Sequence, residues 1–240
     1  MLSWYSVLVC VMRFDIITVF PKIFDSYFNE SIVKRARAQK LIDIRVHDLR
    51  KFSTDKHNKV DDRPYGGGPG MVLKLEPLAK AIGSILSIKY KVSSIKKKTL
   101  VILFSASGKQ FDQSAARLMS KKYNRIIMIA GHYEGIDERI KSLIHNTGYL
   151  IQEISIGPYV LTGGEIPAMV IVDAVSRQIP GVLGKHESLE EKRQGIGVPV
   201  YTRPEVFEYK NKKYCVPKIL LSGNHKKIDG WRRAKKKHHD

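Results

Sequence analysis

Short apolar runs alternate along most of the chain with segments of helical periodicity. The runs are rich in Ile, Val, Leu and Phe, a pattern typical of strands buried on both faces. We expect strands at residues 14–20, 42–46, 99–104, 125–130 and 147–154. Buried strands that alternate with helices predict an α/β fold, in which helices cover both faces of a mostly parallel sheet.

The segments between these runs carry helical spacing or loop composition. Helices are expected at residues 23–39, 72–87, 114–121 and 166–177, with a further helical segment within 225–239. The basic residues Lys34, Arg35 and Arg37 lie towards the end of the first helix, where the helix dipole favours positive charge. Residues 53–71 read as a polar loop, SASGKQFDQ as a strand-to-helix turn, and the basic segment 89–98 as a surface insertion.

The segment SIGPYVLTGGEIPAMVIVDAVSRQIPGVLG, residues 155–184, combines a glycine-broken turn with an apolar helix. Pro167 is tolerated in the first turn of that helix, and Glu165 lies where the dipole favours a negative charge. Helical spacing predicts a buried face formed by Met169, Val172, Val175 and Ile179. Taken alone, this segment fits a tight turn that leads into a core helix.

Three of the expected strands end in glycine-bearing loops, SASG, GHYEG and SIGPYVLTGG. Ligands of parallel sheets bind outside the carboxyl ends of the strands, where such loops meet. Glycine also lets the backbone approach a ligand closely. The three loops together therefore predict a cofactor pocket. It is not a Rossmann site, because no GxGxxG motif follows the first strand.

The composition favours a polyanionic partner. The 240 residues contain 42 Lys and Arg against 23 Asp and Glu, a formal net charge of +19. Nucleic acid is the usual partner of such a chain, although an AT-rich genome also enriches lysine. The two cysteines, Cys10 and Cys215, form no metal or disulfide pattern, which favours a reducing, cytoplasmic compartment. No apolar stretch is long enough to predict a membrane span.

Six motifs identify a family resemblance. VDDRPYGGGPGM, GHYEGIDER, SIGPYVLTGGEIPAM, VDAVSRQIPGVLG, YTRPE and LLSGNHKKIDGWR resemble, in this order, the bacterial tRNA (guanine-N1)-methyltransferases. The resemblance implies a SPOUT-type parallel sheet with a deep trefoil knot and an obligate homodimer whose active sites use both subunits. It also implies S-adenosylmethionine as cofactor and methylation of the tRNA guanosine just 3′ of the anticodon.

The resemblance also organises the chain into parts. Residues 12–184 correspond to the methyltransferase domain, 185–203 to a linker with an active-site loop, and 204–240 to a small, shortened and basic helical domain that binds tRNA. Residues 1–11 are expected to be an extension upstream of a native start at Met12, where the first strand begins.

The cofactor residues follow from the matching positions. The resemblance implies that these line the S-adenosylmethionine site: Leu103, Phe104, Ser105, Gly108, Gly131, Tyr133, Glu134, Gly135, Ser155, Ile156, Gly157, Tyr159, Leu161, Gly163 and Gly164. His132 stands where the family usually has arginine, while the two glycines of the motif GHYEG are kept.

The chemistry requires a base and a cation. Guanine N1 carries a proton at neutral pH, so a base must remove it while charge develops on O6. Arg177 matches the family arginine that stabilises this charge, although its position also fits an arginine paired with Asp173 at the end of a helix. Asp61 resembles a family residue near the catalytic loop.

The family's base is an aspartate, and this chain has Lys192 in its place. Glu191 is the favoured replacement, with Glu190 and Glu187 as alternatives, and each could equally be a solvated loop charge. A weakly active or inactive RNA-binding relative, or an enzyme for another RNA position, therefore stays open. Magnesium supports the family's activity, but no dedicated carboxylate cage is expected here.

Contacts with tRNA are expected from basic residues and from the loop around VDDRPYGGGPG. Arg63 and Tyr65 of that loop could contact nucleic acid, or the loop could be a series of turns. Contacts with tRNA phosphates are expected from a group of cations: Lys34, Arg35, Arg203, Lys226, Lys227, Arg232, Arg233 and Lys235 to Lys237. Taken singly, each of them also fits a solvated surface charge.

Overall fold

The computed structural model describes residues 11–86, 98–184 and 198–235. The chain divides into two compact units, Met1–Val182 and Leu183–Asp240. Residues 1–10, most of the basic segment 89–98 and the acidic loop with Glu187, Glu190, Glu191 and Lys192 lie outside the described residues, so the expectations for them stay predictions.

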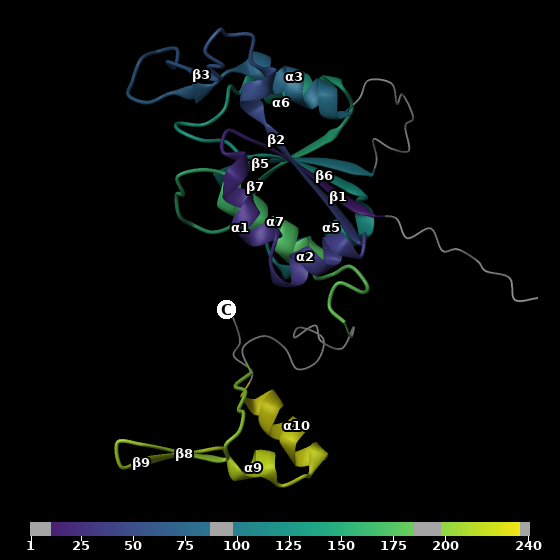
Figure 1. Ribbon diagram of the computed structural model, residues 1–240, viewed down its shortest axis with the longest axis vertical. Helices are drawn as coiled ribbons and strands as arrows, with labels where there is room; N and C mark the ends of the chain where they lie inside the picture. Colours follow the sequence, from purple (N-terminus) through teal and green to yellow (C-terminus); the bar gives the residue numbers. More distant parts are fainter. Residues whose placement is uncertain (1–10, 87–97, 185–197, 236–240) are drawn as a thin grey trace, which may run out of the picture. The chain divides into compact units, whose positions relative to one another are not determined.

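The first unit is built on one parallel sheet with strand order β2-β1-β6-β5-β7 (Figure 1). Its strands are β1 (Met12–Thr18), β2 (Ile42–Asp48), β5 (Thr99–Gln110), β6 (Arg125–Ile129) and β7 (Leu150–Ser155). All five match apolar runs in the sequence, so the predicted parallel α/β sheet is confirmed.

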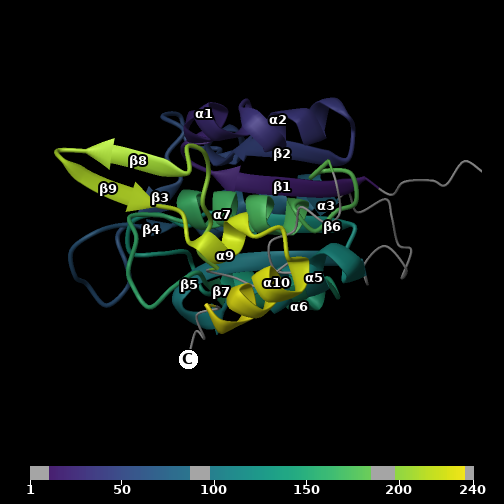
Figure 2. The ribbon, with the colours of Figure 1, turned by 90° about the horizontal axis from the view of Figure 1, so that it is seen from below.

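Helices cover both faces of the sheet (Figures 1 and 2). Alternation along β1 sends Phe14 and Ile16 into one core and Ile17 into the other. The core of Phe14 is closed by η1 (Pro21–Phe24), α1 (Asp25–Phe28), α2 (Ser31–Ala38), α5 (Gln113–Lys122) and α7 (Glu165–Ser176). The core of Ile17 is closed by η2 (Leu49–Phe52), α3 (Leu75–Leu86) and α6 (Arg139–Asn146).

The buried face of α7 differs partly from the expected one. Val172 and Val175 are fully buried as expected, but Met169 and Ile179 are only partly buried. Ala168 and Ile171 complete the buried face instead. The face that meets the core is therefore rotated slightly from the one that the spacing of the larger apolar residues predicts.

A single helix at 23–39 was a wrong prediction. The segment forms η1, α1 and α2, with a break at Asn29 and Glu30, and Ser31 adopts a φ of 50°. The Arg37 guanidinium donates to Phe28 O at 3.1 Å and to Asn29 Oδ1 at 2.9 Å. The break is stabilised because a side chain of α2 donates a hydrogen bond to the last carbonyl of α1, which has no partner within its own helix.

Two other boundaries differ from expectation. The helix expected at residue 72 begins at Leu75, because β4 (Val72–Leu73) pairs with β3 (Asp61–Asp62) as a short antiparallel ribbon. The expected turn SASGKQFDQ is largely strand, since β5 continues to Gln110 with a register shift between Phe104 and Lys109. The helix α6 was not predicted.

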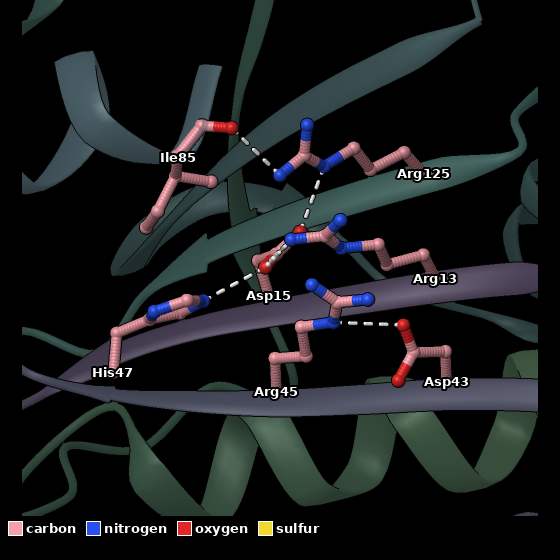
Figure 3. A network of polar contacts seen from close by, with 7 residues as sticks. All are labelled: Arg13, Asp15, Asp43, Arg45, His47, Ile85 and Arg125. Carbon is pink, nitrogen blue, oxygen red and sulfur yellow. Dashed lines mark hydrogen bonds and ion pairs between the residues drawn. The ribbon is translucent and has the colours of Figure 1, made fainter. Parts of the chain in front are cut away.

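A buried ionic cluster joins three strands of the sheet (Figure 3). Asp15 is fully buried; its Oδ1 lies 2.8 Å from both Arg13 Nη2 and His47 Nε2, and its Oδ2 accepts from Arg125 Nε at 2.7 Å. Arg125 Nη2 also donates to Ile85 O at 2.9 Å at the end of α3. Burial alone would raise the pKa of Asp15, but the hydrogen bonds from His47, Arg13 and Arg125 outweigh it and hold that pKa well below its usual range.

The described residues of the second unit, 183–184 and 198–235, form a hairpin and two helices. Its elements are β8 (Val206–Tyr209), β9 (Lys212–Cys215), α9 (Lys218–Leu221) and α10 (His225–Ala234). The helix α10 confirms the expected helical segment, while the antiparallel hairpin was not predicted in a domain expected to be helical. Within the described ranges of both units, no helix is long and apolar enough to cross a membrane.

Candidate cofactor cleft and active site

A cleft opens where β5, β6 and β7 end, beside the start of α7. It has a volume of about 660 Å³, including space open to solvent. Thirteen of the fifteen residues expected at the cofactor line it. The lining also includes residues that sequence reasoning did not assign: Ala106, His132, Ile136, Ile154, Val160, Thr162 and Pro167.

Leu103 and Gly108 do not line the cleft. Leu103 is 2% exposed and packs in the core beneath it. Gly108 lies in β5 against β7, where a Cβ would come 2.7 Å from the backbone nitrogen of Ile154. Both residues therefore support the strand ends that carry the cleft, and Gly108 lets two backbones approach at the register shift.

The third glycine loop packs directly on the second. Gly164 N donates to Gly131 O at 2.8 Å, and a Cβ on Gly164 would lie 2.6 Å from the Cα of Ala130. Ser155 closes the turn that begins this loop, because its hydroxyl donates to Gly157 O at 2.8 Å and accepts from Gly157 N at 3.2 Å. Backbone contacts thus determine the shape of the cleft, as the glycine pattern predicts.

A buried carboxylate lies behind the cleft. Glu165 is 4% exposed, and its Oε1 accepts a hydrogen bond of 2.7 Å from the Thr18 hydroxyl at the end of β1. Its Oε2 lies 3.7 Å from His132 Nδ1, beyond hydrogen-bond distance. His132 Nδ1 is buried and has no hydrogen-bond partner among the described residues. The sequence placed Glu165 at the helix start, but nothing local signalled its burial or its contact with Thr18.

The loop that carries Asp61 is attached to the second glycine loop. Glu134 N donates to Met71 O, and Leu73 N donates to Gly135 O, both at 3.0 Å. Asp61 pairs with Leu73 in the β3–β4 ribbon and does not line the cleft. Beyond it, Tyr65 is fully exposed at the surface of this loop. The ribbon is therefore anchored by backbone hydrogen bonds to a loop that lines the cleft.

Arg177 lies at the other end of α7 from the cleft. Arg177 and Gly164 flank the twelve residues of α7, and a rise of about 1.5 Å per residue separates them by about 20 Å along the helix axis. The neighbouring Asp173 accepts a hydrogen bond of 2.6 Å from the Tyr27 hydroxyl. Burial, together with this hydrogen bond, raises the pKa of Tyr27 to about 12, although the charge of Arg177 opposes the shift. Within one chain, Arg177 and the cleft are thus separate.

The expected tRNA-binding cations are distributed over both units. Lys34 and Arg35 are exposed on α2, and Lys226, Lys227 and Arg233 are exposed on α10. Arg232 on the same helix is half-buried and lies 3.5 Å from Asp229. Arg203 and Lys235 are also exposed, while Lys236 and Lys237 lie outside the described residues. In the part of the chain that the structure describes, no three His, Cys, Asp or Glu side chains group as metal ligands.

Comparison with known proteins gives a consistent family. Residues 12–240 match the family model described as tRNA (Guanine-1)-methyltransferase TrmD. The chain is 51% identical to the tRNA (guanine-N(1)-)-methyltransferase of Dictyoglomus turgidum over 226 residues, which cover 93% of this chain and 84% of that protein. It is 48% identical to the enzyme of the same name from Clostridioides difficile over 225 residues, 92% of this chain and 91% of that protein. The chain therefore belongs to the tRNA (guanine-1)-methyltransferase family.

Proposed function

We propose that this protein transfers a methyl group from S-adenosylmethionine to N1 of the tRNA guanosine just 3′ of the anticodon. The observation that carries the proposal is the cleft, in which three loops distant in sequence bring together thirteen of the residues that the resemblance assigns to the cofactor. Its lining combines backbone groups, glycines and apolar side chains, which suits a nucleoside joined to an amino acid.

S-adenosylmethionine supplies an electrophilic methyl group when bound. The backbone of the three loops would hold its adenosine and methionine parts. Bond formation between guanine N1 and the methyl carbon would be balanced by loss of the carbon–sulfur bond, with S-adenosylhomocysteine as the product. The N1 proton passes to a carboxylate, for which we favour Glu191 over Glu190 and Glu187. Arg177 stabilises the negative charge that develops on O6.

The distance between Arg177 and the cleft supports a shared site. Arg177 lies about 20 Å from Gly164 along α7, and is therefore far from the loops that form the cleft of its own chain. We therefore infer a homodimer in which Arg177 of one copy serves the cleft of the other. We also infer a knotted chain path, which rests on the resemblance alone.

Substrate binding would combine charge and shape. The exposed cations of α2 and α10 would neutralise tRNA phosphates, while Asp61, Arg63 and Tyr65 would lie beside the target base. Removing the guanosine from its stack brings N1 within reach of the cofactor. We place the activity in the cytoplasm. Magnesium would act through the substrate or cofactor.

The decisive experiment measures transfer of labelled methyl groups to tRNA transcripts. Transcripts with guanosine 3′ of the anticodon should be methylated, and those with adenosine there should not. In Arg177→Ala, kcat should fall about 100-fold or more with unchanged cofactor affinity, because one charge-stabilising donor is removed. Arg117→Ala, on the exposed face of α5, is the matched control.

Mixed dimers test the shared site. Gly164→Ala should block the cleft, because its new Cβ would lie 2.6 Å from the Cα of Ala130. Mixing this variant with Arg177→Ala, under conditions that exchange subunits, should restore transfer, because some dimers then have one intact site. Two folded variants that exchange subunits without any recovery would contradict the shared site.

Lys192 stands where the family has its catalytic aspartate, and this difference motivates the rival functions. If the wild-type protein binds cofactor and tRNA but transfers no methyl group, it is an inactive RNA-binding relative. Transfer to the adenosine-bearing transcript would instead indicate another RNA position. Glu191→Gln should abolish most transfer, and unchanged turnover would exclude Glu191 as the base.

A further inference from the structure

The hairpin of the second unit presents two chemically different faces. Val206 pairs with Cys215, Phe207 with Tyr214, Glu208 with Lys213, and Tyr209 with Lys212. Paired residues in an antiparallel ladder share a face, and faces alternate along each strand. One face therefore carries Phe207, Tyr209, Tyr214 and Lys212, and the opposite face carries Val206, Glu208, Lys213 and Cys215. We call the first of these the aromatic face.

The aromatic face is open to solvent. Phe207, Tyr209 and Tyr214 are each 55% exposed, although large apolar side chains usually bury most of their surface. The rings of Phe207 and Tyr209 lie 9° from parallel with centroids 6.4 Å apart. Two neighbouring ring planes in one orientation are a platform on which flat groups can stack.

The turn and the charges complete this arrangement. Lys210 and Asn211 form a two-residue connection with φ values of 48° and 61°, the left-handed geometry that matches the twist of a hairpin. Lys210 Nζ lies 5.4 Å from the centre of the Tyr209 ring. Lys213 is paired with Glu208 at 3.0 Å on the opposite face. Lys210 and Lys212 therefore supply positive charge beside the exposed rings.

We propose that the aromatic face binds unpaired nucleotides of the RNA substrate by stacking, with Lys210 and Lys212 on the adjoining phosphates. Aromatic side chains beside cations on an exposed β surface are the usual means of binding single-stranded nucleic acid. A polyanionic occupant is favoured over an apolar protein surface by the lysines and by the net charge of +19. The inference deepens the proposed function, since it names the part of the protein that holds unpaired tRNA bases.

The test variant exchanges the three rings for leucine, Phe207→Leu/Tyr209→Leu/Tyr214→Leu, in the full-length protein. Leucine keeps apolar surface but removes the planar ring, so it separates stacking from general apolar contact. The matched control, Val206→Ala/Cys215→Ser, changes the opposite face of the same hairpin. Fluorescence anisotropy with a labelled single-stranded pyrimidine oligonucleotide measures binding without requiring methyl transfer.

The ring variant should bind the oligonucleotide about tenfold or more weakly than the control, as expected when one base no longer stacks. In transfer assays its KM for tRNA should rise by a similar factor, with unchanged kcat and cofactor affinity. A separate variant, Lys210→Ala/Lys212→Ala, should reduce the slope of log Kd against log salt by about 0.7 for each phosphate that the lysines no longer neutralise, whereas the ring variant should keep the slope.

Other results would overturn the inference. Equal oligonucleotide binding by the ring variant and the control would exclude stacking. A changed molar mass of the ring variant in light scattering would show that the face packs on a second copy, and a lowered unfolding midpoint would show that it packs within the chain. Absence of transfer by the wild-type protein would contradict the proposed function alone, because the anisotropy comparison does not depend on transfer.

Discussion

Two buried carboxylates, Asp15 and Glu165, lie at strand β1 but differ in how completely their oxygens are paired. Asp15 is on the strand itself, and Glu165 reaches the strand's last residue, Thr18, from the start of α7. Both oxygens of Asp15 are engaged by arginine or histidine (Figure 3). Only Oε1 of Glu165 has a hydrogen bond among the described residues, and its Oε2 lies 3.7 Å from His132 Nδ1.

The difference separates a structural cluster from a group at the candidate site. A buried charge is tolerated when paired groups replace its hydration, as they do around Asp15. At Glu165 the second oxygen lies beside the cleft together with His132 Nδ1, which has no hydrogen-bond partner within the described ranges. Arg13 Nε in the Asp15 cluster is likewise buried without a hydrogen-bond partner among the described residues, so the contrast concerns the carboxylates: both oxygens of Asp15 are paired, whereas one oxygen of Glu165 is not.

Removing Asp15 should have the largest effect on stability. Asp15→Ala should lower the free energy of unfolding by about 3–5 kcal/mol, because the arginines of the cluster lose their buried counter-charge. Urea unfolding measures the change. Asp43→Ala is the control, since Asp43 pairs with Arg45 at the surface and should cost less than about 1 kcal/mol. Equal losses from the two variants would contradict a special role for the buried cluster.

The same cluster should make stability depend on pH. The folded-state pKa of Asp15 lies below its unfolded value of about 3.9, so the stabilisation is complete above that value. It should be lost progressively as the pH falls from about 4 towards the folded pKa. Urea unfolding between pH 3 and 7 should show a steeper acid loss for wild type than for Asp15→Ala.

Removing Glu165 should cost less and should affect the cleft. Glu165→Ala should lower the free energy of unfolding by about 1.5–3 kcal/mol, because the hydrogen bond from Thr18 is removed. It should also weaken cofactor binding, measured by calorimetry, whereas Asp15→Ala should leave that affinity unchanged in the folded protein. If cofactor affinity falls only in Asp15→Ala, the contrast between the two carboxylates is wrong.

Alanine substitutions at two glycines should change the free energy of unfolding in opposite directions. Gly108→Ala should destabilise by about 1–3 kcal/mol, because its Cβ would lie 2.7 Å from the backbone of β7 beneath the cleft. Gly83→Ala, inside α3 with nothing within 4 Å of the new Cβ, should stabilise by up to about 1 kcal/mol. Thermal unfolding of both variants measures the difference, and a stable Gly108→Ala would show that the two strands can separate without cost.

The helix break and the hairpin were not predicted, because a contact between two helices and an unusual turn produce them. Asn29 and Glu30 interrupt a segment whose periodicity alone favours one helix, and the break is stabilised by Arg37 from the helix that follows. The hairpin has a Lys-Asn turn in place of the glycine that usually signals a two-residue connection. In each case tertiary or turn geometry outweighs the average preference of the residues.

The sequence by itself determined the parallel sheet, the glycine loops at its carboxyl edge and the family, because apolar periodicity and motifs are properties of neighbouring residues. Thirteen of the fifteen residues that the motifs assign to the cofactor line one cleft. Only the tertiary structure decided which distant residues meet. Arg125 reaches Asp15 across 110 positions, and Thr18 reaches Glu165 across 147. The structure also placed Arg177 at the opposite end of α7 from Gly164, about 20 Å along the helix axis, because a continuous helix holds its two ends apart.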